Sequence, residues 1–321
     1  MGAATAPALS VVIPAHNRAD LVGHTLSSLA GQSLPPEQYE VIVIDDGSTD
    51  ATPEVVSAWE RRGRVRLLRR KENRGPGAAR NDGIREAIGD IVVFVDSDVV
   101  VRRDFLAHHL ATHRRAGRAV VCRGPVVPTS EMPPASSGHE RLPVAALSPS
   151  FFDPANASLP RHELLAAGLF DEQFGTYGWE DVDLGFRLRR RGLARVFCRD
   201  AVAYHYQPVP SAQSFEGMMA KEEKRARAAV YLYRKYPRWS TRWLIQYTLA
   251  HRVAYFLLAA GGLLNARTAP ALAARFRRSG RISLEYGALR AALNRHYLAV
   301  LRRAWREGAR WEATADGAAS R

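Results

Sequence analysis

The first 120 residues alternate two patterns of apolar side chains. Short apolar runs rich in β-branched residues, each ending in polar or turn residues, occupy 10–14, 40–45 and 90–96. Such runs are typical of strands that are buried on both faces of a parallel sheet. Between and after them, the spacing of apolar residues predicts helices at about 20–30, 53–61, 77–87 and 104–115. This alternation indicates βαβ units with right-handed crossovers, so we expect an α/β fold with a doubly wound, mostly parallel sheet and helices on both faces.

The pattern changes after residue 123. Prolines interrupt residues 124–149 six times, which predicts a long loop. Helices are expected again at 161–167 and 181–190, with a strand at 194–198 between that second helix and the last third of the chain. From residue 211 onward the pattern is almost entirely helical. We therefore expect two parts, residues 1–210 and a helical region at 211–321.

Charge divides the chain in the same way. The net charge is +14, yet residues 1–210 hold 25 Lys+Arg against 25 Asp+Glu, and residues 211–321 hold 21 against 7. A basic helical region predicts an anionic partner, either a membrane face or a nucleic acid. Its longest apolar run, at 253–264, has 12 residues, whereas a bilayer needs about 20.

Compartment is suggested by two further features. Only Cys122 and Cys198 are present, too few for a disulfide framework. The N-terminal residues lack the basic and apolar segments of a secretory signal. We expect a cytoplasmic protein, with peripheral contact to the inner face of the membrane as an option.

Acidic residues follow two of the predicted strands. Asp45 and Asp46 end the second run, while Asp96 and Asp98 end the third. Each pair alone also suits an ordinary turn. In an open α/β sheet, however, ligands bind at the carboxyl ends of the strands, and four carboxylates at one edge repel unless a cation or hydrogen-bond donors lie between them.

A cation bound together with phosphates would offset the repulsion among these four carboxylates. Paired aspartates suit Mg²⁺ or Mn²⁺, which bind one or two carboxylates together with substrate phosphates and water. Arg74 and Arg80 belong to a glycine-rich helix entry, residues 73–81, that could approach a diphosphate. A solvated helix start explains both arginines equally well. Neither a P-loop signature nor GxGxxG after the first strand is present.

A second acidic group lies at 175–188. Glu180 and Asp181 begin a predicted helix, where carboxylates also simply stabilise the helix dipole. Tyr177 and Trp179 precede them and form an aromatic platform suited to a sugar face, so a carboxylate there could be a general base for a hydroxyl. Asp183, four residues before an arginine, is expected to form a surface ion pair.

Two histidines have open roles. His205 follows a predicted strand and could bind the metal through a neutral imidazole, or could be a structural residue. His16 has the same ambiguity.

Five motifs in this order, VVIPAHNR, VIVIDDGSTD, NRGPGAARNDGI, VVFVDSDV and GWEDVDLGFRL, resemble glycosyltransferase family 2, the inverting enzymes of the GT-A fold. The resemblance covers roughly residues 8–206 and makes residues 1–210 the nucleotide-sugar-binding and catalytic domain. It implies contacts from Pro14, His16 and Asp46 to the base and ribose, and a metal- and ribose-binding role for Asp96 and Asp98. It also implies that Asp181 is the catalytic base, that Glu180 holds the acceptor and that His205 binds the metal. Asn17 completes the first motif and is assigned to substrate binding, as are Arg74, Arg80 and Trp179. His16 stands where the family often has an aromatic residue, which leaves the preferred nucleotide open.

The function implied is metal-assisted single displacement. A nucleotide-diphosphate sugar, with UDP-sugar favoured, would donate its sugar to a carbohydrate or lipid-linked acceptor, in cell-surface polysaccharide or glycolipid synthesis. Two alternatives are a sugar-nucleotide-forming nucleotidyltransferase and a non-catalytic protein that binds anions or nucleic acid. The first needs a glycine-rich basic signature after the first strand, which this chain lacks. The second conflicts with the acidic strand ends, so no nucleic acid is expected.

The last helical pattern, at 286–306, is amphipathic. Its apolar side holds Tyr286, Leu289, Leu293, Tyr297 and Val300, and arginines lie broadly opposite. This side could pack on the catalytic domain or dock on anionic lipid, helped by Trp239, Trp243, Trp305 and Trp311.

Overall fold

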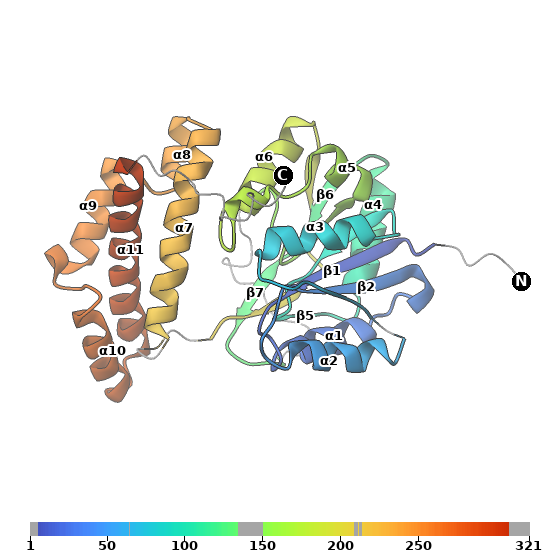
Figure 1. Ribbon diagram of the computed structural model, residues 1–321, viewed down its shortest axis with the longest axis horizontal. Coiled ribbons are helices and arrows are strands. Elements are labelled where there is room, and N and C mark those ends of the chain that lie inside the picture. The colour runs from blue at the N-terminus through green and yellow to red at the C-terminus, as the bar shows by residue number, and fades with distance from the viewer. Residues whose placement is uncertain (1–5, 64, 134–149, 209–210, 212–213, 308–321) are drawn as a thin grey trace, which may run out of the picture. The chain divides into compact units, whose positions relative to one another are not determined.

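The computed structural model describes residues 6–63, 65–133, 150–208, 211 and 214–307. It divides into two compact units: Met1–Glu172 with Glu180–Pro208, and Gln173–Trp179 with Val209–Arg321. The first is a mixed α/β unit and the second is helical (Figure 1). We call them the α/β unit and the helical unit.

A seven-stranded sheet forms the centre of the α/β unit, with the strand order β3-β2-β1-β4-β8-β6-β9. Every neighbouring pair is parallel except those made by β8, which runs antiparallel to β4 and β6. The strands are β1 (Leu9–Ala15), β2 (Tyr39–Asp45), β3 (Arg66–Arg69), β4 (Ile91–Phe94), β6 (Val120–Arg123), β8 (Ala157–Pro160) and β9 (Ala194–Phe197). The expected doubly wound, mostly parallel sheet is confirmed.

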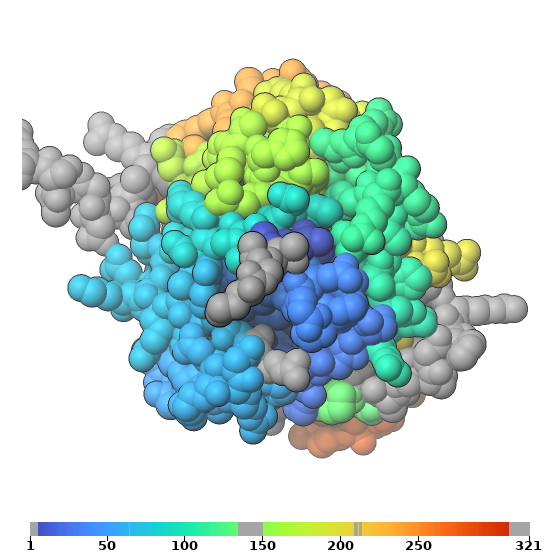
Figure 2. Space-filling view, turned by 90° about the vertical axis from the view of Figure 1, so that its right-hand side faces the viewer, coloured from blue at the N-terminus to red at the C-terminus, as the bar shows by residue number. Residues whose placement is uncertain are grey.

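Helices cover both faces of this sheet, because alternate residues of the central strands are apolar on each side. Val11 and Val43 belong to one buried cluster, whereas Val12, Ile42 and Phe94 belong to the other. The helices are α1 (Val22–Ala30), α2 (Thr52–Glu60), α3 (Pro76–Glu86), α4 (Phe105–Ala116), α5 (Arg161–Ala166) and α6 (Glu180–Arg190). Segments distant in sequence meet on this unit's surface, where residues of α4 (teal) border those of α5 and α6 (lime) (Figure 2). Complete burial of an apolar side chain of these two clusters stabilises the fold by about 1.5–3 kcal/mol.

A second, three-stranded sheet was not expected from the sequence. Its order is β5-β10-β7, formed by β5 (Val99–Val101), β10 (Ala203–Tyr206) and β7 (Val126–Thr129). β7 corrects the expected loop at 124–149: residues 126–129 pair in parallel with β10, and residues 134–149 of that loop lie outside the described residues. β10 pairs antiparallel with β5 and sets His205 opposite Val99, so this small sheet brings the end of the α/β unit back to the strand that begins directly after Asp98.

The helical unit consists of five α-helices among its described residues. They are α7 (Phe215–Lys235), α8 (Trp239–Leu244), α9 (Leu249–Leu258), α10 (Thr268–Arg278) and α11 (Ile282–Arg306). The apolar side of α11 is internal to this unit: Leu289 and Leu293 cluster with Phe215 of α7 and with alanines of α10. Tyr297 and Val300 are also buried, and only Tyr286 of this side is exposed, so lipid docking by this side is corrected.

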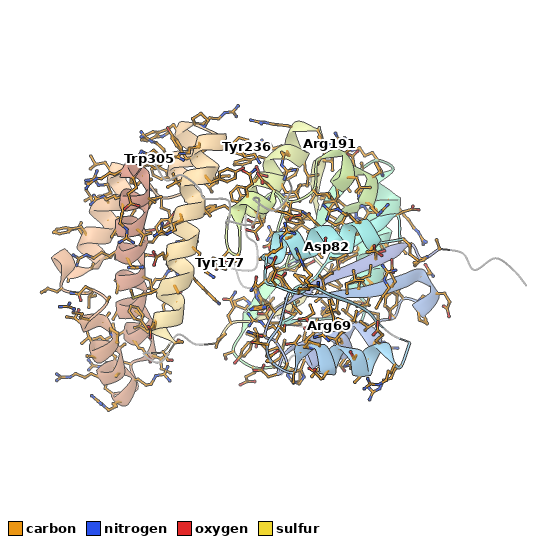
Figure 3. The ribbon with its side chains drawn as sticks, viewed as in Figure 1. Arg69, Asp82, Tyr177, Arg191, Tyr236 and Trp305 are labelled. Atoms are coloured by element: carbon orange, nitrogen blue, oxygen red, sulfur yellow. The ribbon has the colours of Figure 1, made fainter. Side chains whose placement is uncertain are left out.

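Trp305 is likewise engaged inside the helical unit, where Figure 3 labels it. Its ring lies 4.7 Å from Tyr233 and 4.6 Å from Tyr247, between ring centroids. Trp311 lies outside the described residues. Within the described part of the chain, no helix combines the length and apolar character needed to cross a membrane.

Candidate active site

The carboxyl ends of β1 and β2 are joined by hydrogen bonds between the first two motifs. His16 Nδ1 lies 2.9 Å from the backbone oxygen of Asp46. Asn17, at a left-handed φ of 50°, donates its backbone N–H to Ser48 Oγ and accepts from the Thr49 N–H through its side-chain oxygen. Pro14 is buried inside β1. The structure therefore brings the first and second motifs together at one sheet edge.

Asp46 is held by the beginning of α3. Its carboxylate accepts the backbone N–H groups of Arg74 at 3.1 Å and Gly75 at 2.7 Å, and Arg70 Nε lies 3.5 Å away. Burial nevertheless outweighs these donors and raises the pKa of Asp46 above its usual value. Gly75 serves as the N-cap at φ 95°, a conformation that glycine adopts without strain.

α3 lies unusually close to the sheet. A Cβ on Gly83 would stand 2.5 Å from Val12 and 2.7 Å from Ile44, so this glycine permits the approach. Arg80 lies about one turn earlier in the same helix. Arg74 points elsewhere in the unit, and its guanidinium pairs with Glu172 at 2.8 Å.

Arg80 joins the two acidic motifs. Its side chain is 5 % exposed, its Nη2 donates to Asp96 at 2.7 Å, and its Nη1 lies 3.6 Å from Glu180. Although burial alone would lower the pKa of this guanidinium, the charges of Asp96 and Glu180 raise it above its ordinary value. Arg80 is therefore a buried cation that fixes carboxylates from two motifs more than 80 residues apart. Phosphate contact by Arg74 and Arg80 stays a prediction, since both pair with carboxylates here.

Asp96, Asp98 and His205 form a cluster in which one ligand atom from each lies within 4.8 Å of the others. His205 Nε2 is 3.3 Å from Asp98 Oδ1, and Arg18 Nε is 3.5 Å from Asp98 Oδ2. Burial alone would lower the pKa of His205, but the Asp98 hydrogen bond and charge raise it. The same contact lowers the pKa of Asp98 against the effect of burial. Two carboxylates and one imidazole fit Mn²⁺ or Mg²⁺, with the cation replacing the shared proton.

Asp181 stands in the first turn of α6. Burial and the neighbouring charge of Glu180 raise its pKa to about 7, which suits a residue that takes a proton near neutral pH. Asp183 does pair with Arg187, at 2.7 Å, but it is fully buried. The expected surface pair is therefore an internal one, which anchors α6.

Asp153 was missed by the sequence interpretation. Its negative charge contributes to raising the pKa of both Asp181 and His205, so it lies within electrostatic reach of both. Arg123, which is fully buried, holds it at 3.0 Å. A single aspartate before a proline carries no signal that could have identified it.

The aromatic platform belongs to the helical unit. Trp179 Nε1 donates to the backbone oxygen of Arg225 at 3.0 Å, and the Arg225 guanidinium lies 5.8 Å from the Trp179 ring. Tyr177 is 41 % exposed. Sugar contact by Trp179 stays a prediction.

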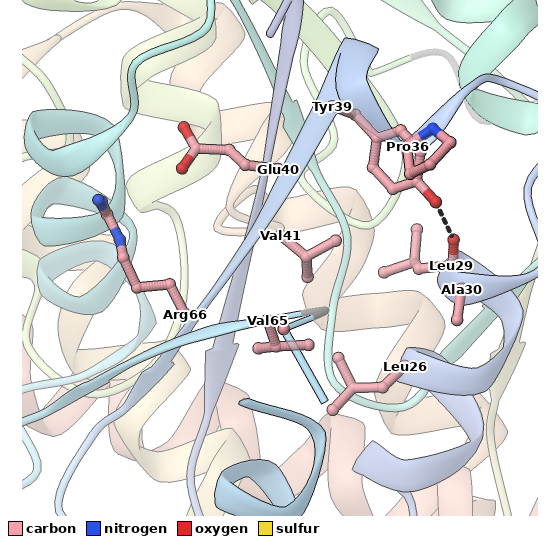
Figure 4. A pocket seen from close by; sticks show the side chains of 10 residues that line it. Leu26, Leu29, Ala30, Pro36, Tyr39, Glu40, Val41, Val65 and Arg66 are labelled. Atoms are coloured by element: carbon pink, nitrogen blue, oxygen red, sulfur yellow. Dashed lines mark hydrogen bonds between the residues drawn. The ribbon is translucent and has the colours of Figure 1, made fainter. Parts of the chain in front are cut away.

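A pocket elsewhere in the α/β unit is not part of this cluster (Figure 4). Tyr39 and Val41 line it together with Leu26 and Arg66, at the amino-terminal ends of β2 and β3. Tyr39 donates its hydroxyl hydrogen to the backbone oxygen of Leu29. The acidic residues end the strands at the opposite edge, so the two features are separate.

These contacts give one sheet edge two chemical capacities. The cluster of Asp96, Asp98 and His205 can bind a divalent cation, and Asp181 can accept a proton. Arg80 ties the two together through Asp96 and Glu180.

Comparison with known proteins agrees with this geometry. Residues 10–165 match the model of the family described as Glycosyl transferase family 2. The chain is 32% identical over 229 residues to a validoxylamine A glucosyltransferase of Streptomyces hygroscopicus subsp. limoneus, covering 61% of this chain and 51% of the relative. It is 29% identical over 266 residues to the uncharacterized glycosyltransferase YfnE of Bacillus subtilis (strain 168), covering 66% and 68%. The chain thus spans only about half the length of the first of these relatives.

Among solved structures, the mannosyltransferase PcManGT from Pyrobaculum calidifontis in complex with GDP-Man and Mn²⁺ is similar, with a TM-score of 0.61 and 21% identity. The match covers 94% of this chain and 88% of that one. The likeness shows the fold, a GT-A-like α/β architecture.

Proposed function

The chain belongs to glycosyl transferase family 2, and we propose that it transfers a sugar from a nucleotide-diphosphate sugar to an acceptor hydroxyl with inversion at the anomeric carbon. UDP-sugar is the favoured donor, and a carbohydrate or a lipid-linked saccharide of the cell envelope is the favoured acceptor. The supporting observation is the buried Arg80. Its guanidinium contacts both Asp96 of the VVFVDSDV motif and Glu180 of the GWEDVDLGFRL motif.

The donor would lie along the carboxyl ends of β1 and β2. His16, Asn17 and Asp46 line this edge with polar atoms, which suits the base and ribose. Pro14, buried within β1, would support that surface from below. The left-handed turn at Gly47, φ 68°, brings the backbone after β2 against Glu72 and Asn73, which shapes the same edge.

The diphosphate would face Asp96, Asp98 and His205. A divalent cation held by these three residues would supply positive charge beside the leaving phosphate oxygens. Arg18, 3.5 Å from Asp98, orients that carboxylate. The PcManGT structure contains GDP-Man and Mn²⁺, which supports a metal-dependent donor site here.

Proton transfer falls to Asp181. Its carboxylate takes the hydrogen of the acceptor hydroxyl, the hydroxyl oxygen bonds to the anomeric carbon, and the bond from that carbon to the diphosphate oxygen breaks. Glu180 stays paired with Arg80 and accepts a hydrogen bond from a neighbouring acceptor hydroxyl. Because attack and departure occur on opposite faces of the sugar, the configuration inverts.

A nucleotide-release screen tests the proposal without knowledge of the acceptor. The full chain is incubated with UDP-, GDP- and dTDP-sugars in the presence of Mg²⁺ or Mn²⁺, and free nucleotide diphosphate is measured. We expect slow metal-dependent release from one nucleotide class, abolished by Asp96→Asn.

The matched control is Asp90→Asn. Asp90 is exposed just before β4, whereas Asp96 follows the end of that strand, so the control removes the same charge at the opposite edge and should release nucleotide normally. Equal loss in both variants, or release that needs no metal, would contradict the site. Pyrophosphate formation from a nucleoside triphosphate would instead indicate nucleotidyl transfer.

A further inference from the structure

Exposed apolar side chains are concentrated in one stretch of the helical unit. Of the sixteen large apolar residues that are exposed in the described part of the chain, twelve lie between residues 239 and 286. Trp239 and Trp243 of α8 are 67 % and 55 % exposed. Contiguous apolar patches of more than a few hundred Å² are uncommon on proteins that act alone in water. The exposed side chains of this stretch therefore suit contact with a partner.

α9 carries five of these exposed residues. Leu249, Val253, Phe256 and Leu257 follow the i, i+4, i+7, i+8 spacing of one helix face, and each is at least half exposed. On the other side of the helix, Tyr255 donates its hydroxyl hydrogen to Gln246 at 2.8 Å, although Leu258 on that side is exposed as well. α9 thus turns its apolar stripe outward, the reverse of a helix that packs on a protein core.

The charge around this stripe has one sign. Residues 236–284 contain eight arginines and no Asp or Glu, and one of these arginines, Arg277, pairs with Glu285 directly after this range. Arg252 is exposed on α9, one turn before Phe256 and on the flank of the apolar stripe. An apolar stripe flanked by a cation, in a segment that contains no acid of its own, is complementary to a surface that is anionic outside and apolar inside.

We propose that α8 and α9 form an interfacial surface that docks on an anionic lipid bilayer. The apolar stripe enters the boundary between headgroups and acyl chains, and the arginines contact lipid phosphates. α9 has 10 residues and so lies in the membrane plane rather than across it. This surface is separate from the proposed reaction and does not depend on it.

Charge favours lipid over a second copy of the chain as the partner of this surface. In a two-fold dimer the same patch meets itself, so the arginines of one copy would face those of the other without an acid from this segment between them. That repulsion opposes self-association and favours an anionic partner.

Vesicle flotation tests the surface with the full chain. The vesicles contain phosphatidylcholine alone or with about a third phosphatidylglycerol, at low and high salt. We expect binding only to the anionic vesicles, weakened by salt. Phe256→Ser/Leu257→Ser should weaken binding by about tenfold or more, and Arg252→Ala by about fivefold.

The matched control is Ile88→Ser/Leu165→Ser. It removes two exposed apolar side chains of the α/β unit and should bind vesicles as the unaltered chain does. Should the α9 variant fail to fold, quenching of tryptophan fluorescence by brominated lipid measures insertion in the unaltered chain. Trp239→Phe/Trp243→Phe should abolish that quenching.

Three results would overturn the proposal. The first is absence of binding to anionic vesicles at low salt. The second is undiminished binding by the α9 variant. The third is a dimer in sedimentation that Phe256→Ser/Leu257→Ser converts to a monomer, which would show that a second copy covers the stripe.

Discussion

The two units distribute charge and apolar surface in opposite ways. In the α/β unit, apolar strands are buried on both faces and ions of both signs are drawn inside, as with Arg80 between Asp96 and Glu180. In the helical unit, α9 holds its apolar stripe outside, among arginines without acidic neighbours in residues 236–284. Buried charge and exposed apolar surface are both costly. Each arrangement therefore indicates a site at which the chain binds another molecule.

Stability alone does not explain the buried charges. A buried ion pair is often no better than well-packed apolar side chains of similar volume, so the pairs of Arg80 contribute position more than folding free energy. What they position are Asp96, of the metal cluster, and Glu180, directly before the proposed base. The same reasoning gives the stripe of α9 little part in folding, because each of its four side chains is at least half exposed.

The largest effect should come from the proposed base. Asp181→Asn keeps the shape of the side chain but removes its basicity, so transfer should fall by about a thousandfold. Donor affinity, measured by isothermal titration with the nucleotide sugar, should change less than twofold. Asp90→Asn serves as the control. Full residual transfer by the Asp181 variant would refute the assignment and would leave the α/β unit with a buried acid of no chemical use.

Loss of the metal cluster should have the next largest effect. Asp98→Asn removes one carboxylate and the partner of His205, so we expect donor affinity to fall by about a hundredfold in the presence of Mn²⁺. In the unaltered chain, a chelator should abolish transfer and added Mn²⁺ or Mg²⁺ should restore it. Transfer that survives chelation would show that arginines alone balance the diphosphate.

The pH dependence should be smaller and has a definite sign. Burial and Glu180 raise the pKa of Asp181 to about 7, and a general base works only when it is ionised. Transfer should therefore rise by about tenfold between pH 6 and pH 8. Glu180→Gln removes a negative neighbour, which lowers the pKa of Asp181, so the midpoint should move to lower pH. A flat profile across this range would contradict the assignment.

The sequence predicted those parts of the fold that each segment determines by itself. β1, β2 and β4 were evident because strands buried on both faces are continuous apolar runs. β7 and β10 have four residues each and pair with strands far away in sequence, so their stability depends on tertiary contacts that local patterning does not contain. The expected loop at 124–149 was wrong at β7 for this reason.

The candidate site also has one part that the sequence predicted and another that it did not. Acids at the ends of parallel strands were predicted to converge because parallel strands share an edge. The contact of Arg18 with Asp98, the pairing of Arg74 with Glu172 and the presence of Asp153 were not predicted, because each depends on how loops fold back over that edge. In the helical unit, amphipathicity of 286–306 showed that α11 has an apolar side. It did not show that α7 and α10 cover this side.

The smallest effect separates the two units most sharply. Phe256→Ser/Leu257→Ser alters side chains that are 59 % and 68 % exposed, so it removes little packing and should leave the melting temperature within about 2 °C. Transfer to a soluble acceptor should change less than twofold, because Asp181 and the metal cluster belong to the other unit. Transfer to an acceptor embedded in anionic vesicles should fall, since the chain no longer concentrates at the bilayer. An equal fall with both acceptors would mean that α9 supports catalysis itself, and the division of labour between the units would then be wrong.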